Sequence, residues 1–212
     1  VRDPALRQKL TPGFSIGCKR LLLSNTYLRS LTRPNVTLHA TALASVDGSR
    51  VTGKDGSTAD VDTIILATGF HVADLPIARH LFDAQGQRLA DQWAKTGAQA
   101  YLGTSIAGFP NLFLMLGPNL GTGHSSAFTI VEAQLGYLLK ALAHMKRNAL
   151  QSIDVLPEVQ ARHNERVQAA LAGTIYNAGG CSSYYLDERG RLAAVGTTLE
   201  IQDFVREGGG RM

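Results

Sequence analysis

The chain has 212 residues, of which 44% are hydrophobic and 18% charged, and its formal net charge is +4. This composition is ordinary for a globular protein long enough to bury a core. The basic residues form no continuous run, which argues against a nucleic-acid partner. No stretch approaches the ~20 apolar residues of a membrane span, and no charged-then-apolar leader opens the chain, so we expect neither a span nor a secretory signal.

The first 60 residues predict two short helical segments and then strands. Asp3-Pro4 starts a short helix that ends at Thr11-Pro12-Gly13. A partly helical apolar pattern follows over residues 21–31. From Val36 the pattern alternates as in strands, at 36–40, 42–46 and 50–52, and Asp-Gly pairs at 47–48 and 55–56 are typical of hairpin turns. We therefore expect a small antiparallel meander.

Two apolar runs predict buried strands, at residues 62–66 and 111–116. The region 71–108 between them reads as loop-rich. A long helix is expected from about Ser125 to Arg147, capped by Ser125 or Ser126, and a shorter helix from about Pro157 to Ala172. After Gly179-Gly180 the chain reads as irregular.

The first candidate ligand segment follows the strand at 62–66. Ala67 and Gly69 would let the backbone approach a flat or phosphorylated ligand, and Thr68 offers a hydroxyl. Ligands of open α/β sheets lie beyond such carboxyl ends of strands. A buried strand followed by an ordinary glycine turn explains the same residues.

The second candidate segment is the turn Gly117-Pro118-Asn119-Leu120-Gly121-Thr122-Gly123-His124, which leads into the long helix. Its glycines would expose backbone N–H groups, and the helix N-terminus adds partial positive charge. Such a place stabilises an anion or an electron-rich carbonyl group. A tight strand-to-helix connection without a ligand is the alternative.

Other residues leave alternatives open. For Trp93, the only tryptophan, the alternatives are that it shapes a pocket or that it packs in a core. His124 contacts a ligand or caps the helix, and the spacing of the remaining histidines indicates no metal site. We expect at least one of Glu132 and Gln134 to face solvent.

The two cysteines are far apart in the sequence, at Cys18 and Cys181, and neither has a metal-ligand companion at useful spacing. This pattern favours a reduced, cytoplasmic protein over a single long-range disulfide. Cys181 lacks a placed base that would make it a nucleophile.

Several of these segments, in this order, resemble the class B flavoprotein monooxygenases. The Ala-Thr-Gly motif of the flavin-containing and Baeyer–Villiger monooxygenases is similar to Ile64-Ile65-Leu66-Ala67-Thr68-Gly69-Phe70. The C-terminal half of that superfamily resembles Gly108-Phe109-Pro110-Asn111-Leu112-Phe113 followed by Gly117-Pro118-Asn119. Its middle and late segments resemble Gly17-Cys18-Lys19-Arg20 and Gly180-Cys181-Ser182-Ser183-Tyr184, although Tyr184 stands where a tryptophan is usual.

The resemblance implies an enzyme in which NADPH reduces FAD and one oxygen atom of O₂ is inserted into a ketone or added to a soft heteroatom. It implies an α/β fold: part of an FAD/NAD(P)-binding Rossmann-like domain of the ββα three-layer type, with an antiparallel meander and C-terminal helices. It places near FAD the residues Ala67, Thr68, Gly69, Phe70, Gly117, Pro118, Asn119, Leu120, Gly121, Thr122 and His124. It assigns no catalytic residue.

The chain departs from the superfamily because it contains no Gly-x-Gly-x-x-Gly turn for the FAD pyrophosphate or for NADPH. We therefore expect a C-terminal fragment: residues 1–35 end the NADP domain, 36–150 belong to the FAD domain, and 151–212 form a helix and tail. We expect the fragment alone to be inactive. Self-association, completion by another chain, and a flavoprotein of the disulfide-reductase type remain open, although the last needs a redox cysteine pair.

Overall fold

The computed structural model describes residues 1–69, 72, 74–121 and 126–193. The chain divides into two compact units by its internal contacts. Unit 1 comprises Val1–Phe14 and Leu21–Gly69, and unit 2 comprises Ser15–Arg20 and Phe70–Met212. The short piece 15–20 thus belongs to unit 2, although both of its neighbours in the sequence belong to unit 1.

Unit 1 begins with two short helices, α1 (Pro4–Leu10) and α2 (Tyr27–Ser30). The side chain of Asp3 caps α1 by accepting a hydrogen bond of 2.9 Å from the Leu6 N–H. Pro4 suits the first turn, whose N–H groups have no partner within the helix. The predicted helix at this place is confirmed. Only four residues of the second apolar pattern are helical.

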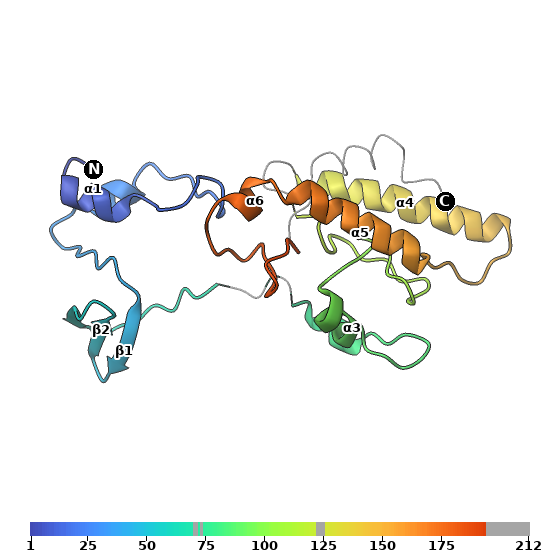
Figure 1. Cartoon of the computed structure of the whole chain (residues 1–212), viewed down its shortest axis with the longest axis horizontal. Helices are drawn as coiled ribbons and strands as arrows, with labels where there is room; N and C mark the ends of the chain where they lie inside the picture. Colours follow the sequence, from blue (N-terminus) through green and yellow to red (C-terminus); the bar gives the residue numbers. More distant parts are fainter. Residues whose placement is uncertain (70–71, 73, 122–125, 194–212) are drawn as a thin grey trace. The chain divides into compact units, whose positions relative to one another are not determined.

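The predicted antiparallel meander is present in unit 1 (Figure 1). Its strands are β1 (Leu43–Asp47), β2 (Arg50–Gly53) and β3 (Thr58–Asp60), in the order β1-β2-β3. Both Asp-Gly pairs form turns, and Gly48 and Gly56 have φ of 58° and 83°, values that favour glycine. Arg50 and Asp60 face each other across the last pair and form an exposed ion pair of 3.0 Å.

Two predicted strands of unit 1 are wrong. Residues 36–40 and 62–66 form no strand, and Ile65 and Leu66 are 86% and 80% exposed instead of buried. No backbone hydrogen bond joins residues 62–69 to another described residue. An apolar run forms a buried strand only when a neighbouring strand pairs with its backbone, and the described part of unit 1 offers no such neighbour to this run.

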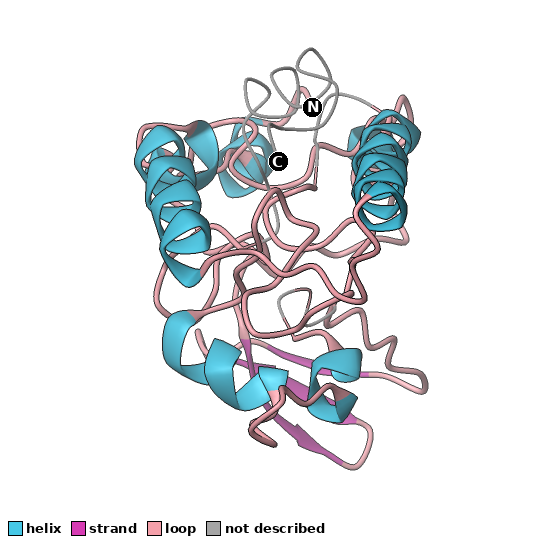
Figure 2. Cartoon of the chain, turned by 90° about the vertical axis from the view of Figure 1, so that its right-hand side faces the viewer, coloured by secondary structure: helices cyan, strands magenta, loops and turns pink. Residues whose placement is uncertain are grey.

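Unit 2 contains η1 (Pro76–His80), α3 (Leu89–Thr96), α4 (Ala127–Arg147), α5 (Pro157–Leu171) and α6 (Ile175–Ala178). The two long helices α4 and α5 lie on either side of irregular segments, as Figure 2 shows. Tyr137 of α4 contacts Ser105 (hydroxyl oxygens 3.3 Å apart), whereas Gln160 of α5 accepts a hydrogen bond of 2.8 Å from the Ala107 N–H. The segment around residues 101–114 is therefore held from both sides, and both predicted long helices are confirmed within about two residues.

The predicted strand at 111–116 is also wrong. Only Phe113 forms an isolated bridge, with Ser105. Asn111 and Leu116 have φ of 62° and 51°, which no strand residue adopts. Backbone N–H groups of this segment donate to Gln134 of α4 and to the carbonyl oxygens of Thr104, Phe109 and Ile153, none of which lies in a strand.

Unit 2 has two apolar clusters. One contains Leu89, Ala100, Ile106 and Phe109, with Trp93 packed against it, and the other contains Val167, Leu171, Tyr185 and Leu192. Trp93 thus lies on helix α3, and the prediction of a loop at this place is wrong. The chain combines helices with a small antiparallel sheet, and among the described helices none is long and apolar enough to cross a membrane.

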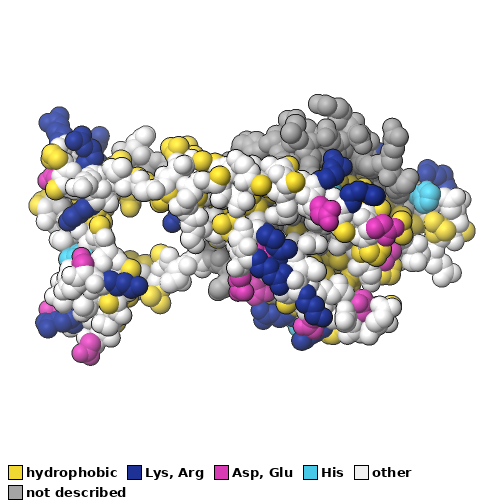
Figure 3. All heavy atoms as spheres, viewed as in Figure 1, with side chains coloured by type: hydrophobic (Ala, Val, Ile, Leu, Met, Phe, Trp, Pro, Cys, Tyr) yellow, Lys and Arg dark blue, Asp and Glu magenta, His cyan; other side chains and the backbone are white. Residues whose placement is uncertain are grey.

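Large hydrophobic side chains also lie at the surface, and Figure 3 shows such side chains in yellow between charged ones. In unit 1 the most exposed are Leu22, Leu23, Ile65 and Leu66, each at least 80% exposed. Unit 1 thus leaves these four large apolar side chains uncovered within the described chain.

Candidate functional site

The glycine-rich turn is packed against another backbone segment of unit 2. Gly117, Pro118 and Asn119 are buried. A Cβ at Gly117 would lie 2.3 Å from the carbonyl oxygen of Gly103, and a Cβ at Gly103 would lie 2.4 Å from Cγ of Leu120. Only glycine allows two backbone segments to approach so closely. These two glycines are therefore explained by the packing of the chain on itself.

Asn119 joins the turn to the late segment of the chain. Its backbone N–H donates to the carbonyl oxygen of Ala193 at 2.9 Å, and its Nδ2 donates to the carbonyl oxygen of Leu192 at 2.6 Å. Its φ of 63° lies in the left-handed region, which asparagine tolerates better than most residues. Asn119 thus uses its donors to hold the turn in place.

Gln134 of α4 is the main anchor of the segment that leads into the turn. Its Oε1 accepts from the Leu116 N–H at 2.9 Å, and its Nε2 donates to Thr104 Oγ1 at 2.8 Å and to the Leu114 carbonyl oxygen at 3.0 Å. The side chain is 1% exposed, whereas Glu132 faces solvent, as expected for at least one of the pair.

Sequence reasoning missed the role of Gln134. The spacing on α4 could have revealed it, because Gln134 lies four residues after the buried Ile130 and seven before the buried Ala141. These intervals place all three residues on one helix face.

The helix that follows the turn begins as predicted. Ser126 caps α4, and its Oγ accepts a hydrogen bond of 3.2 Å from the Phe128 N–H. The partial positive charge of a 21-residue helix is concentrated at this end. Thr122 and His124, which the sequence places beside the ligand, lie outside the described residues, as does the alternative cap Ser125.

The other candidate segment, Ala67 to Gly69, is exposed. Gly69 has φ of 86°, and a Cβ there would meet no atom within 4 Å. Unlike Gly117, this glycine is not required by a close contact within the described chain. The segment belongs to unit 1 and the glycine-rich turn to unit 2. Phe70 lies outside the described residues.

Trp93 both packs in a core and lines a cavity, so both of the roles predicted as alternatives apply to it. Its Nε1 donates to the Gln99 carbonyl oxygen at 3.1 Å. One side of the residue borders a cavity of about 400 Å³ that Leu75, Ala78 and Tyr184 also line. Two acidic residues that line this cavity form ion pairs: Asp187 with Arg191 at 2.9 Å, and Asp74 with Arg79 at 2.6 Å.

Burial perturbs two titratable groups of unit 2. Burial, with a smaller contribution from the charge of Arg166, lowers the pKa of His163 to about 4, and its ring contacts that of Tyr101 edge-on. Burial and the neighbouring Tyr184 hydroxyl raise the pKa of Tyr185, against the effect of Arg20. Within the described chain, no group of three His, Cys, Asp or Glu side chains is placed to hold a metal ion.

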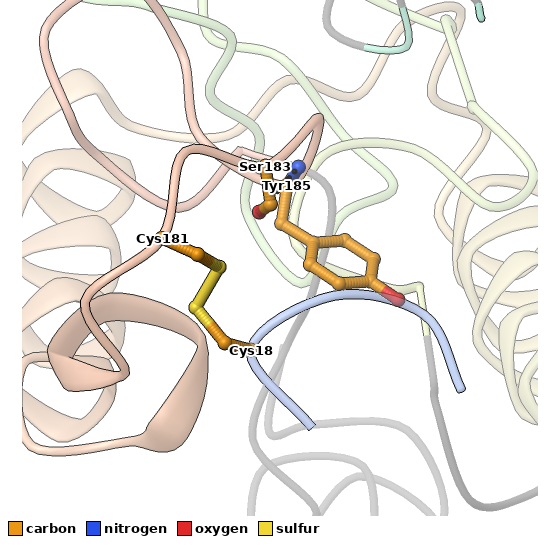
Figure 4. The surroundings of a disulfide bond; sticks show 4 residues. All are labelled: Cys18, Cys181, Ser183 and Tyr185. Carbon is orange, nitrogen blue, oxygen red and sulfur yellow. Dashed lines mark hydrogen bonds between the residues drawn. A yellow bond between two sulfur atoms is a disulfide. The ribbon is translucent and has the colours of Figure 1, made fainter. Parts of the chain in front are cut away.

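The two cysteines form a disulfide, so the prediction of reduced, unpaired thiols is wrong (Figure 4). Cys18 and Cys181 are 163 residues apart in the sequence, and their Cα atoms are 6.2 Å apart. Sequence spacing could not show this pair because the fold of unit 2 brings the two segments together. The bond removes Cys181 as a nucleophile, and the cytoplasmic location loses the support it drew from free cysteines.

Comparisons with known proteins show what this architecture is similar to. No protein-family model matches the chain. A Baeyer–Villiger monooxygenase of Streptomyces coelicolor is 44% identical over 95% of the chain, and one of Pseudomonas aeruginosa is 43% identical over 88%. The chain is related to the Baeyer–Villiger monooxygenases. It spans 39% and 35% of the length of these two relatives.

Solved structures of Baeyer–Villiger monooxygenases agree with this relation. OTEMO in complex with FAD and NADP matches 97% of the chain with a TM-score of 0.79 at 25% identity, and the match spans 39% of that chain. Cyclohexanone monooxygenase from Rhodococcus sp. Phi1 bound to NADP⁺ matches 97% of the chain with a TM-score of 0.78 at 26% identity, and the match spans 40% of that protein. The predicted partial Rossmann-like α/β fold is thereby confirmed.

Proposed function

We propose that the chain is the C-terminal part of an FAD- and NADPH-dependent Baeyer–Villiger monooxygenase. In the complete enzyme, one oxygen atom of O₂ is inserted into a small-molecule ketone or added to a soft heteroatom. The observation that carries this proposal is the 44% identity to a Baeyer–Villiger monooxygenase over 95% of the chain. The OTEMO structure, which contains FAD and NADP and matches 97% of the chain, supports FAD and NADPH as the cofactors.

We assign the FAD contacts to the two candidate segments. Ala67, Thr68 and Gly69 fit a close approach of the cofactor, because their backbone is exposed and the space beside Gly69 is open. Phe70 continues this segment. In the sequence of unit 2, Gly121, Thr122 and His124 come between the packed turn and α4, whose N-terminal partial charge favours an electron-rich ligand.

The buried part of the glycine-rich turn has a positioning role in this proposal. Gly117, Pro118 and Leu120 hold the backbone against Gly103, and Asn119 ties it to the late segment. The bound cofactors supply the redox chemistry. The residues of this chain orient FAD and exclude water on one side of it.

A second candidate is a flavin-binding module that another polypeptide completes. The exposed run Ile64 to Leu66 favours it, because these apolar side chains have no strand partner in the described part of unit 1. The disulfide-reductase type is weaker: a cysteine pair exists after all, but the named relatives are monooxygenases.

The main proposal and the partner-completed module can be tested with one set of proteins. The chain would be fused to the N-terminal part of the Streptomyces coelicolor relative, and the two parts would also be expressed as separate chains. We expect the fusion to show the visible absorbance of bound flavin, to oxidise NADPH and to convert a cyclic ketone into a lactone. We expect the chain alone to be colourless and not to consume NADPH.

The intact relative is the control for folding and activity. A fusion that folds and binds FAD but oxygenates neither a ketone nor a sulfide would contradict the proposed activity. Stoichiometric FAD on the isolated chain would contradict the division of the cofactor site between two parts. Activity restored by the separate chains would favour the partner-completed module.

A further inference from the structure

The disulfide joins the segment 15–20 to the late segment of unit 2. Cys18 is completely buried, and Cys181 is only partly buried. Gly179 makes room for the bond, because a Cβ there would lie 2.7 Å from Cβ of Cys18. The Ser15 N–H donates to the Gly179 carbonyl oxygen at 2.9 Å. The two segments are therefore fitted to each other around the sulfur atoms.

Tyr185 is the second point at which the two segments meet. Its ring is directed toward the segment that carries Cys18, as Figure 4 shows, and Arg20 acts on its hydroxyl through a hydrogen bond and through its charge. Tyr185 is 6% exposed and belongs to the apolar cluster around Leu171. The late segment thus stays anchored in the core by Tyr185, whereas the segment 15–20 has no buried hydrophobic residue besides Cys18.

The segment 15–20 has no neighbour in the sequence that belongs to its own unit. Residues 1–14 and 21–69 on either side of it form unit 1, whereas the segment belongs to unit 2. Its place in unit 2 therefore depends on contacts with distant residues, and the disulfide is the covalent one.

We propose that the Cys18–Cys181 disulfide is a reversible redox modification site that fastens the segment 15–20 to the late segment of unit 2. The reductant is a dithiol. Its thiolate attacks Sγ of Cys181, the less buried of the two residues, and the Cys18 thiolate leaves and takes up a proton. The second thiol of the reductant then displaces Cys181. Two electrons pass to the protein, which gains two thiols, and the reductant becomes a cyclic disulfide.

Limited proteolysis tests the proposal directly, because trypsin cleaves after Lys19 and Arg20, which lie next to Cys18 and are exposed. We expect dithiothreitol to raise the cleavage rate at these two sites about tenfold, since proteolysis follows the population of the released segment. Cleavage after Lys146 and Arg147 at the end of α4 is the internal reference and should not change. Removal of the dithiol under air should restore the slow rate.

The variant C18S should be cleaved rapidly after Lys19 and Arg20 with or without dithiothreitol, and C181S should behave in the same way. Thiol titration of the wild-type chain should give no thiols before reduction and two after it. The wild-type measurement keeps the test valid if a variant does not fold. Unchanged rates after reduction, two free thiols before it, equal acceleration at Lys146 and Arg147, or failure to restore the slow rate would each overturn the proposal.

Discussion

Two segments of this chain look alike in sequence and differ in structure. Each is an apolar run that leads into small residues, 64–69 in unit 1 and 112–121 in unit 2. In the first, Ile65 and Leu66 are at least 80% exposed, whereas Gly117 and Asn119 in the second are buried. The second segment therefore has packing partners within the chain, whereas among the described residues the first has none.

The support of the second segment comes from distant residues of unit 2. Gln134 bonds to its backbone on one side, and Gly103 contacts the turn on another. The first segment has no comparable partner among the described residues of unit 1. Apolar character alone therefore favours burial, but a strand also needs its backbone groups paired.

The largest expected effect is at the packed turn. G117A would place a Cβ 2.3 Å from the carbonyl oxygen of Gly103, and the backbone must shift to relieve the clash. We expect a loss of about 3 kcal/mol in the free energy of unfolding, measured by denaturant unfolding with Trp93 fluorescence. The control G136A lies on α4 with nothing within 4 Å and should be neutral or stabilising by up to about 1 kcal/mol. Equal stability of the two variants would refute the close contact.

The second-largest effect on stability is expected at Gln134. Q134L leaves the Leu116 N–H and the Leu114 carbonyl oxygen without this buried partner, so we expect a loss of about 2 kcal/mol. The same unfolding measurement applies, with E132L as a matched exposed control on the same helix that should change stability by less than about 0.5 kcal/mol. A neutral Q134L would mean that water replaces the side chain at no cost.

The pH dependence of the packed region follows from His163. Because burial lowers its pKa from 6.5 to about 4, the unfolded chain binds more protons than the folded chain between these values. The contribution is fully favourable above pH 6.5 and is lost as the pH falls, on the order of 1 to 2 kcal/mol between pH 7 and pH 5. H163Q should flatten this part of the stability profile, measured by thermal unfolding at several pH values. An unchanged slope of stability against pH in H163Q would mean that a group other than His163 causes the pH dependence.

The smallest effect in the isolated chain should be at the exposed segment. I65S removes a side chain that is 86% exposed, so we expect its free energy of unfolding to stay within about 0.5 kcal/mol of the wild type. In the fusion with the N-terminal part of a relative, the same change should weaken flavin binding, because the residue is then covered. A large loss in the isolated chain would show that residue 65 already has a partner there.

Local signals predicted several local elements of this protein. Asp3 and Pro4 mark the start of α1, the Asp-Gly pairs at 47–48 and 55–56 mark the hairpin turns, and Ser126 marks the start of α4. These features depend on residues within a few positions of each other. The Ala-Thr-Gly and glycine-rich motifs predicted the relation to the monooxygenases, which the comparisons confirm. The assignment of individual FAD contacts remains a prediction.

The sequence by itself thus determined helices α1, α4 and α5, the antiparallel meander and the relation of the chain to the monooxygenases. Only the tertiary structure decided that Cys18 and Cys181 are bonded and that residues 62–66 form no strand. It also decided that the side chain of Gln134, and not a neighbouring strand, bonds to the backbone of Leu116. The physical reason is the same in each case. A cap or a tight turn is stabilised by neighbours in the sequence, whereas a disulfide, a buried hydrogen bond and a strand pairing require a partner from a distant part of the chain.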